Sequence, residues 1–164
     1  MRTGAIYKRV SDTYTTSELQ SNGTIKGMAI GTLFEHQGKV YKLVNAGGTI
    51  AVNSLVKYKG DVTTYGPLGA AVVATAAATD GVAGVAETAI TSGDFGWITV
   101  GGVASVLTVD AVGAHEMLAA SGTAGTAQKA PNTTTVAEKV FGVSLEANGS
   151  GGAAAKKVLL QGLI

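Results

Sequence analysis

The sequence has no cysteine, only two prolines and two histidines, and few charged or aromatic side chains. The missing cysteine excludes disulfide bonds, cysteine-ligated zinc and thiol catalysis. Two prolines in 164 residues exclude collagen-like and proline-rich architectures. Charged residues make up 14% of the chain and hydrophobic residues 46%, whereas a disordered chain carries more charge and less apolar surface. The composition therefore predicts a folded protein.

Targeting and membrane-spanning signals are also scarce. Arg2, Lys8 and Arg9 lie near the start of the sequence, but no apolar stretch follows them, so we expect no secretory signal peptide. The longest run of small apolar residues covers 68–78 and is too short to span a bilayer. We therefore expect a protein that is made in a cytoplasm and has no membrane partner.

Glycine, in contrast, is abundant, and its 24 residues separate short segments rich in valine, isoleucine and threonine. Such segments between Gly or Asn turns favour β-strands. The predicted strands cover residues 30–35, 39–44, 49–58, 82–90, 116–120, 140–145 and 156–160. The run 95–109, which contains the single tryptophan, is predicted to form two short strands joined by a Gly101-Gly102 turn. Many short strands of this kind predict an all-β fold with a small β-barrel or sandwich body.

The chain divides into four predicted parts. Residues 1–24 are polar and rich in threonine, so we expect an extended N-terminal arm that orders only against a partner. Residues 25–66 are predicted to form a β-hairpin region. Residues 67–80 form an alanine-rich linker or strand, because alanine favours helix while valine and threonine oppose it. Residues 81–164 form the β-rich main body.

The net charge of +1 is unevenly distributed along the chain. Residues 1–60 carry +5, residues 61–128 carry −6 without a single Lys or Arg, and residues 129–164 carry +2. A basic front and an acidic middle indicate a polar docking surface, either between copies of the chain or onto a larger acidic object. An ordinary solvated surface explains the same distribution equally well.

Residues that could carry catalysis are few and poorly spaced. His115-Glu116 begins like a zinc-protease motif, but Ala119 stands where the second histidine would be needed. Gly38-Lys39 is followed by valine and not by the Ser or Thr of a phosphate-binding loop, and no Gly-x-Ser-x-Gly elbow occurs. The tyrosines form no nucleic-acid stacking motif. We therefore predict that the chain is not an enzyme, with no catalytic, cofactor-binding or metal-binding residues and no nucleic-acid partner.

Four segments of the second half share short β-branched runs between glycine turns. They are 84–102 (GVAETAITSGDFGWITVGG), 121–127 (SGTAGTA), 140–147 (VFGVSLEA) and 157–160 (KVLL). In this order the segments resemble the capsid decoration (cement) proteins of tailed bacteriophages. The likeness covers about half of the chain, residues 81–162.

The resemblance implies a small β-rich virion protein that is made in the host cytoplasm and binds the outside of an icosahedral head. It implies two partners, the major capsid protein and further copies of the chain in a homotrimer at three-fold or quasi-three-fold positions. Its expected role is to stabilise the expanded shell against internal DNA pressure. No catalytic residue carries over from the family.

Two sets of residues are predicted to make the contacts of such a protein. The predicted capsid contacts, in the arm, are Arg2, Lys8, Arg9 and Tyr14. The predicted core or subunit-interface residues are Trp97, Phe141, Val143 and Leu145. Phe141, Val143 and Leu145 alternate along one face of a predicted strand.

Two other function classes remain open at this point. A β-sandwich adhesin or carbohydrate-binding module of a phage tail or fibre would need surface aromatics for sugar stacking, and the sequence offers only Trp97 and a few tyrosines. A hydrolase has no supporting motif.

Overall fold

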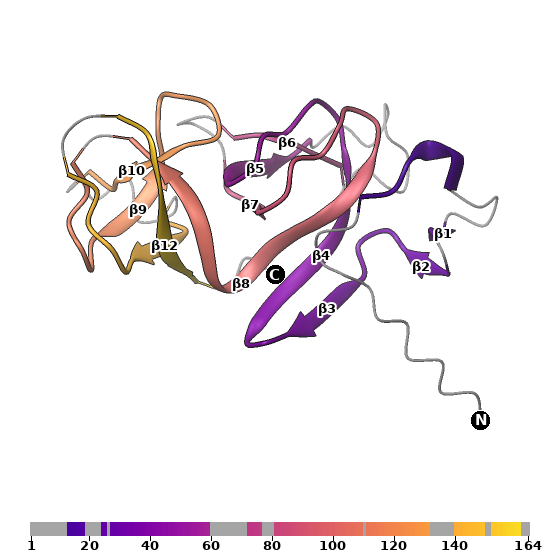
Figure 1. Cartoon of the computed structure of the whole chain (residues 1–164), viewed down its shortest axis with the longest axis horizontal. Coiled ribbons are helices and arrows are strands. Elements are labelled where there is room, and N and C mark those ends of the chain that lie inside the picture. Colours follow the sequence, from indigo (N-terminus) through magenta and orange to yellow (C-terminus); the bar gives the residue numbers. More distant parts are fainter. Residues whose placement is uncertain are drawn as a thin grey trace.

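The computed structural model describes residues 13–18, 24–25, 27–59, 72–76, 81–109, 111–131, 140–149 and 152–161. In these residues the fold is all-β, with one short 3-10 helix, η1 (Thr16–Glu18), and no α-helix (Figure 1). The strands are β1 (Thr24–Ile25), β2 (Met28–Ala29), β3 (Leu33–His36), β4 (Lys39–Ala46), β5 (Ser54–Tyr58), β6 (Val72–Thr75), β7 (Gly84–Ala86), β8 (Phe95–Thr108), β9 (Met117–Ala120), β10 (Ala127–Lys129), β11 (Gly142–Ser144) and β12 (Ala154–Leu160). The predicted all-β body is confirmed. No helix within the described ranges has the length and apolar character needed to cross a membrane.

The main sheet closes on itself twice. One closed ring consists of β4, β6, β5, β7 and β8, and the other consists of β8, β10, β9, β11 and β12. Each ring has one parallel pair, β4–β6 or β8–β10, and four antiparallel pairs. β8 belongs to both rings and runs from one to the other in Figure 1. The body thus consists of two five-stranded barrels, here called the first and second barrel, that share one strand.

The two barrels have the same topology and the same register. Counted in chain order, strand 1 pairs with strands 3 and 5, strand 2 pairs with strands 3 and 4, and strand 4 pairs with strand 5 in both barrels. One residue pair from each of the five strand pairings shows the shared register. In the first barrel these pairs are Ala46–Val73, Tyr58–Val73, Leu55–Val85, Val85–Thr99 and Asn45–Phe95. In the same order, their counterparts in the second barrel are Thr108–Ala127, Ala120–Ala127, Met117–Val143, Val143–Leu159 and Leu107–Ala155. The chain therefore contains an internal structural duplication, in which β8 is the last strand of one copy and the first strand of the next.

Close backbone approaches recur at corresponding positions of the two barrels. A Cβ on Gly84 would lie 2.7 Å from the carbonyl oxygen of Thr99, and a Cβ on Gly142 would lie 2.6 Å from the carbonyl oxygen of Leu159. Only glycine lets the fourth strand of each barrel come this close to the fifth.

The predicted Gly101-Gly102 turn is wrong, because β8 is one continuous strand of 14 residues. Gly102 has φ +86°, and a Cβ at this position would overlap the carbonyl oxygen of Gly38. The two glycines therefore bend the strand without reversing it. The half before the bend pairs with β4 and the half after it pairs with β12, so the flanks find different partners and do not pair with each other.

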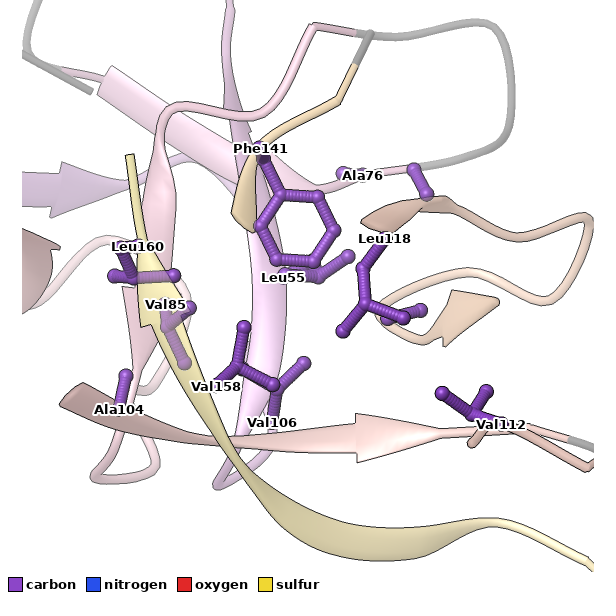
Figure 2. Close-up of a cluster of buried hydrophobic side chains, with 12 residues drawn as sticks. Leu55, Ala76, Val85, Ala104, Val106, Val112, Leu118, Phe141, Val158 and Leu160 are labelled. Carbon is purple, nitrogen blue, oxygen red and sulfur yellow. The ribbon is translucent and has the colours of Figure 1, made fainter. Parts of the chain in front are cut away.

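The described residues form three hydrophobic clusters. The interior of the first barrel contains Val44, Ala46, Ile50, Val56, Ala83, Ala86, Ile90, Ile98 and Val100. A second cluster joins the interior of the second barrel to Leu55, Ala76 and Val85, which belong to the first barrel and the segment after β6 (Figure 2). A third cluster covers the outer face of the first barrel and contains Tyr14, Ile25, Tyr41, Leu43, Phe95 and Trp97. The second cluster makes the two barrels one packed unit.

The strand pairing joins segments that the predicted part boundaries separate. β7 and the first half of β8 lie in the predicted main body 81–164, yet they close the first barrel with β4 and β5. β6 lies within the predicted alanine-rich stretch 67–80. Of the predicted arm, residues 1–12 and 19–23 lie outside the described residues.

Candidate interaction surfaces

An exposed apolar row crosses the outer face of the second barrel. Val103 of β8, Leu159 of β12, Val143 of β11 and Met117 of β9 lie directly opposite one another in consecutive strand pairs, so their side chains share one face. Met117 is 61% exposed and Leu159 is 44% exposed, while Val103 and Val143 are half-buried. These four residues are called the outer row below.

Charged side chains lie near the outer row on both faces of the sheet: Lys129 pairs with Leu118 and shares the inner face of β9, whereas Lys157 shares the outer face with Leu159. Lys129 forms an ion pair with Glu116, which directly precedes Met117. The hydrogen bonds that Glu116 accepts from Lys129 and from the N–H of Gly113 lower the pKa of its carboxyl group. Lys157 lies two residues before Leu159 on β12, and its N–H donates to the carboxylate of Glu146 at 3.1 Å. Lys157 thus borders the outer row on its own face, and an apolar centre with polar neighbours is the usual anatomy of a protein interface.

A second apolar feature lies on β3, whose only partner among the described strands is β4. Leu33 is 46% exposed and Phe34 is 37% exposed. The Phe34 ring stacks on His36 with centroids 6.0 Å apart, and it also lies 6.0 Å from the ring of Trp97 in a tilted arrangement. An unpaired strand edge of this kind can accept another strand.

A half-buried polar network connects the strands at the bend of β8. The carboxylate of Glu87 accepts hydrogen bonds from Lys39 Nζ at 2.8 and 3.0 Å, from Thr99 Oγ1 at 2.9 Å and from the N–H of Ser105 at 3.0 Å. Burial raises the pKa of Glu87, but these hydrogen bonds and the charge of Lys39 outweigh it, so the pKa lies below its ordinary value. Burial, followed by the charge of Glu87, raises the pKa of Tyr41. Because Thr99 and Ser105 stand on opposite sides of the bend, Glu87 holds the bend in place.

Groups that could bind a metal do not converge in the part of the chain that the structure describes, where no three His, Asp or Glu side chains come together. His115 adopts a left-handed conformation with φ 63°, and its N–H donates to the carbonyl oxygen of Ser144. Asn53, the corresponding residue of the first barrel, has φ 60° and donates to the carbonyl oxygen of Ala86. The position of His115 is therefore explained by the turn that both barrels share.

Tyr14, a predicted capsid contact, is 3% exposed and belongs to the third hydrophobic cluster. Its N–H and carbonyl oxygen form hydrogen bonds with the backbone of Phe95, both at 2.7 Å. The structure thus packs Tyr14 against the first barrel and leaves almost none of its ring for another protein. Arg2, Lys8 and Arg9 lie outside the described residues.

The residues predicted for the core or the subunit interface separate into two groups. Trp97 is buried in the third cluster, on the outer face of the first barrel, and Phe141 is buried in the cluster that fills the second barrel. Val143 is half-buried and Leu145 is 38% exposed, so neither is a core residue. The interior side of β11 carries Gly142 and Ser144, and at Gly142 the close approach of β12 leaves no room for a side chain. An interface role for Val143 and Leu145 stays a prediction.

Met117, Leu159 and Val103 of the outer row were not among the predicted contact residues. Short strands with several apolar neighbours do not show which side is covered, and only the pairing of four strands places these residues beside Val143. The alternation of Lys157, Val158 and Leu159 is a weak signal, since it places an apolar residue on the same face as a lysine.

The comparisons with known proteins concern the fold. No family model matches the sequence, and no curated protein matches it. Among solved structures, the chain is similar to the N base of the head fiber gp8.5 of bacteriophage phi29. The TM-score is 0.55 at 18% sequence identity, and the match covers 75% of this chain and 94% of that chain. At this identity the likeness shows a shared fold.

Proposed function

We propose that the chain is a structural protein of a bacteriophage head, which binds the outer surface of the capsid and stabilises it as a cement or decoration protein. The observation that carries the proposal is the fold shared with the base of a phage head fiber over nearly the whole of that structure. The resemblance of residues 84–102 to decoration proteins, found from the sequence, supports the same class.

The described surface suits binding better than catalysis. It presents an exposed apolar row and an open strand edge, and no group of three His, Asp or Glu side chains that could hold a metal ion lies in the described ranges. Each capsid contact contributes a modest free energy, but many copies bound to one shell act together against rupture. We therefore propose that the protein transforms no substrate.

The proposed partners are the major capsid protein and further copies of the chain, with a trimer as the preferred assembly. The N-terminal arm is proposed to lie along the capsid protein, with Arg2, Lys8 and Arg9 contacting it. A basic arm suits a partner surface of opposite charge.

The proposal is tested by mixing the purified protein with phage heads that lack it and sedimenting the heads. We expect the full chain to sediment with the heads and the variant that lacks residues 1–12 to remain in the supernatant. Because the deletion keeps Tyr14, which packs into the body, we expect the described fold to be retained, and circular dichroism checks this expectation. A full chain that stays in solution with intact heads contradicts head binding, and retained binding of the deletion variant contradicts the role of the arm.

The cement role has a separate test, because a protein can bind a head without strengthening it. Decorated heads should retain their DNA at temperatures at which undecorated heads release it. Equal release temperatures would leave head binding in place and exclude the cement role. Binding to a glycan array without binding to heads would instead support the adhesin or carbohydrate-binding alternative.

A further inference from the structure

The internal duplication allows the outer faces of the two barrels to be compared position by position. The outer row of the second barrel corresponds to Tyr41, Thr99, Val85 and Leu55 of the first barrel. All four of these residues are buried, with at most 6% exposure. Leu55 and Val85 pack into the core of the second barrel (Figure 2), and Tyr41 is covered by the N-terminal segment. Other parts of the chain therefore cover these four positions in the first barrel, whereas no described residues cover the outer row of the second barrel.

Other outer positions of the two barrels show which residue types the chain has on a covered face and on an uncovered face. The buried residues Leu43, Phe95 and Trp97 of the first barrel correspond to Ser105, Ala155 and Lys157 of the second barrel. Where the cover is missing, the second barrel thus carries small or charged side chains, as a solvated sheet face does. The outer row departs from this rule, because it is uncovered and still apolar.

We propose that the outer row is the contact through which the chain binds further copies of itself, with the rows of the copies meeting at the symmetry axis of the assembly. The proposal rests on the proposed function and names the residues of the self-contact within it. The occupant is a second copy because, inside the chain, the corresponding face of the first barrel binds a barrel of this same fold. An uncovered apolar stripe rimmed by polar residues marks such a contact.

The row cannot repeat the contact that Leu55 and Val85 make within the chain. The second barrel receives these two side chains in a cluster that contains the small residues Ala104 and Ala120. At the corresponding positions the first barrel has Lys42 and Tyr58, whose Nζ and hydroxyl groups are hydrogen-bonded at 2.9 Å. These larger side chains occupy the place that a row from another copy would need. Contact between the rows themselves, around a shared symmetry axis, avoids these side chains.

The edge of the outer row carries charges of both signs. Lys157 lies on the face of the row and its N–H donates to the carboxylate of Glu146, so two copies meet without a net charge of one sign.

The test compares the self-association of the full chain with that of two variants, Leu159→Lys and Leu33→Lys, by sedimentation velocity over a range of concentrations. Both leucines are on strands and nearly equally exposed, at 44% and 46%, but only Leu159 belongs to the outer row. We expect the wild type to be oligomeric, Leu159→Lys to need at least about tenfold more protein to associate, and Leu33→Lys to behave as the wild type. Met117→Lys, at the more exposed end of the row, should repeat the effect of Leu159→Lys.

Circular dichroism and the buried position of Trp97, read from its fluorescence, verify that the variants are folded. A monomeric wild type at all concentrations, or an oligomer that both row variants leave unchanged, would overturn the proposal. So would an oligomer that Leu33→Lys dissociates, because the contact would then lie on β3.

Cross-linking supplies an independent readout, since the natural chain has no cysteine. A short bis-maleimide should join Leu159→Cys chains to one another and leave Leu33→Cys chains unlinked. The reverse pattern contradicts contact between rows.

Failure of this proposal and failure of the proposed function give different results. If the row mediates self-association but the oligomer never binds heads, the self-contact stands and the head function fails. If monomers bind heads and Leu159→Lys abolishes that binding, the head function stands and the occupant of the row is the capsid protein, which overturns the proposal.

Discussion

At the scale of single residues, Glu87 is the polar group with the largest structural role in the described part of the chain. Its carboxylate connects Lys39, Thr99 and Ser105, and the three donors stand on β4 and on both sides of the bend in β8. A buried carboxylate without these donors would be costly, whereas one with several donors is stabilising in its charged form. The network thus depends on the ionisation of Glu87.

Glu87→Gln is expected to destabilise the protein by about 1–3 kcal/mol near neutral pH, because a neutral amide loses the ion pair with Lys39 and one acceptor. The pKa of Glu87 is lowered in the folded state. Its contribution is therefore present above its ordinary pKa of 4.5 and is lost as the pH falls through the lower, folded value. Urea unfolding at neutral and acidic pH should show that the difference between wild type and variant shrinks in acid. Glu35→Gln, at an exposed position of β3, is the control and should have almost no effect. A difference that is constant or grows in acid would contradict this role for Glu87.

At the scale of elements, the glycine pattern of the sequence predicts several strands correctly and one turn wrongly. Glycine-bounded segments located β4, β9 and β12 closely, because period-two apolar patterns and turn residues are local properties. The same pattern predicts a hairpin turn at Gly101-Gly102, where the structure has a continuous strand. A local pattern cannot show that the two flanks pair with strands more than 40 residues away. The outer row could not be predicted from local patterns for the same reason, since only the pairing of four strands brings its residues together.

The bend of β8 should depend on Gly102. Gly102→Ala places a Cβ against the carbonyl oxygen of Gly38 at a φ of +86°, and we expect a loss of about 2–4 kcal/mol of unfolding free energy. Gly48→Ala is the matched control, because a Cβ at Gly48 meets nothing within 4 Å and should change stability by less than about 0.5 kcal/mol. Urea denaturation measures both variants. Equal stability of the two variants would show that β8 does not need a glycine at its bend.

The fourth strands should respond alike to substitution of their first residue. Gly84→Ala and Gly142→Ala each place a Cβ within 3 Å of a carbonyl oxygen and of a side chain on the fifth strand. We expect each to cost about 1–3 kcal/mol through overpacking. Gly149→Ala, where a Cβ meets nothing within 4 Å, should be nearly neutral. A large effect in one barrel and none in the other, measured by thermal denaturation, would contradict their equivalence.

At the scale of the whole molecule, two barrels of one topology share a strand and a hydrophobic cluster. The duplication is hidden in the sequence because few side chains are the same in both copies. Val82-Ala83-Gly84-Val85 and Val140-Phe141-Gly142-Val143 share three of four residues, but most other corresponding positions differ. Backbone hydrogen bonds between strands and the total volume of the core side chains maintain the register. Many different sequences meet these two requirements. Composition therefore predicted the fold class, but it did not predict the double closure.

The shared cluster predicts that the two barrels unfold together. Leu118→Ala, in the core of the second barrel, should cost about 2–5 kcal/mol. Trp97 is the single tryptophan and lies on the first barrel, so its fluorescence reports on the barrel that was not changed. We expect the fluorescence and circular dichroism transitions to coincide and to shift by the same amount in the variant. A fluorescence transition that stays at its wild-type midpoint would show that the barrels are independent.

The central claim is that this chain functions by binding the outside of a phage head. The measurement that tests it most directly is a cryo-electron microscopy reconstruction of heads that lack the protein, before and after addition of an excess of the full chain. The account predicts added density on the outer surface at regular lattice positions, into which the two joined barrels fit. An unchanged outer surface in the presence of folded protein would contradict it.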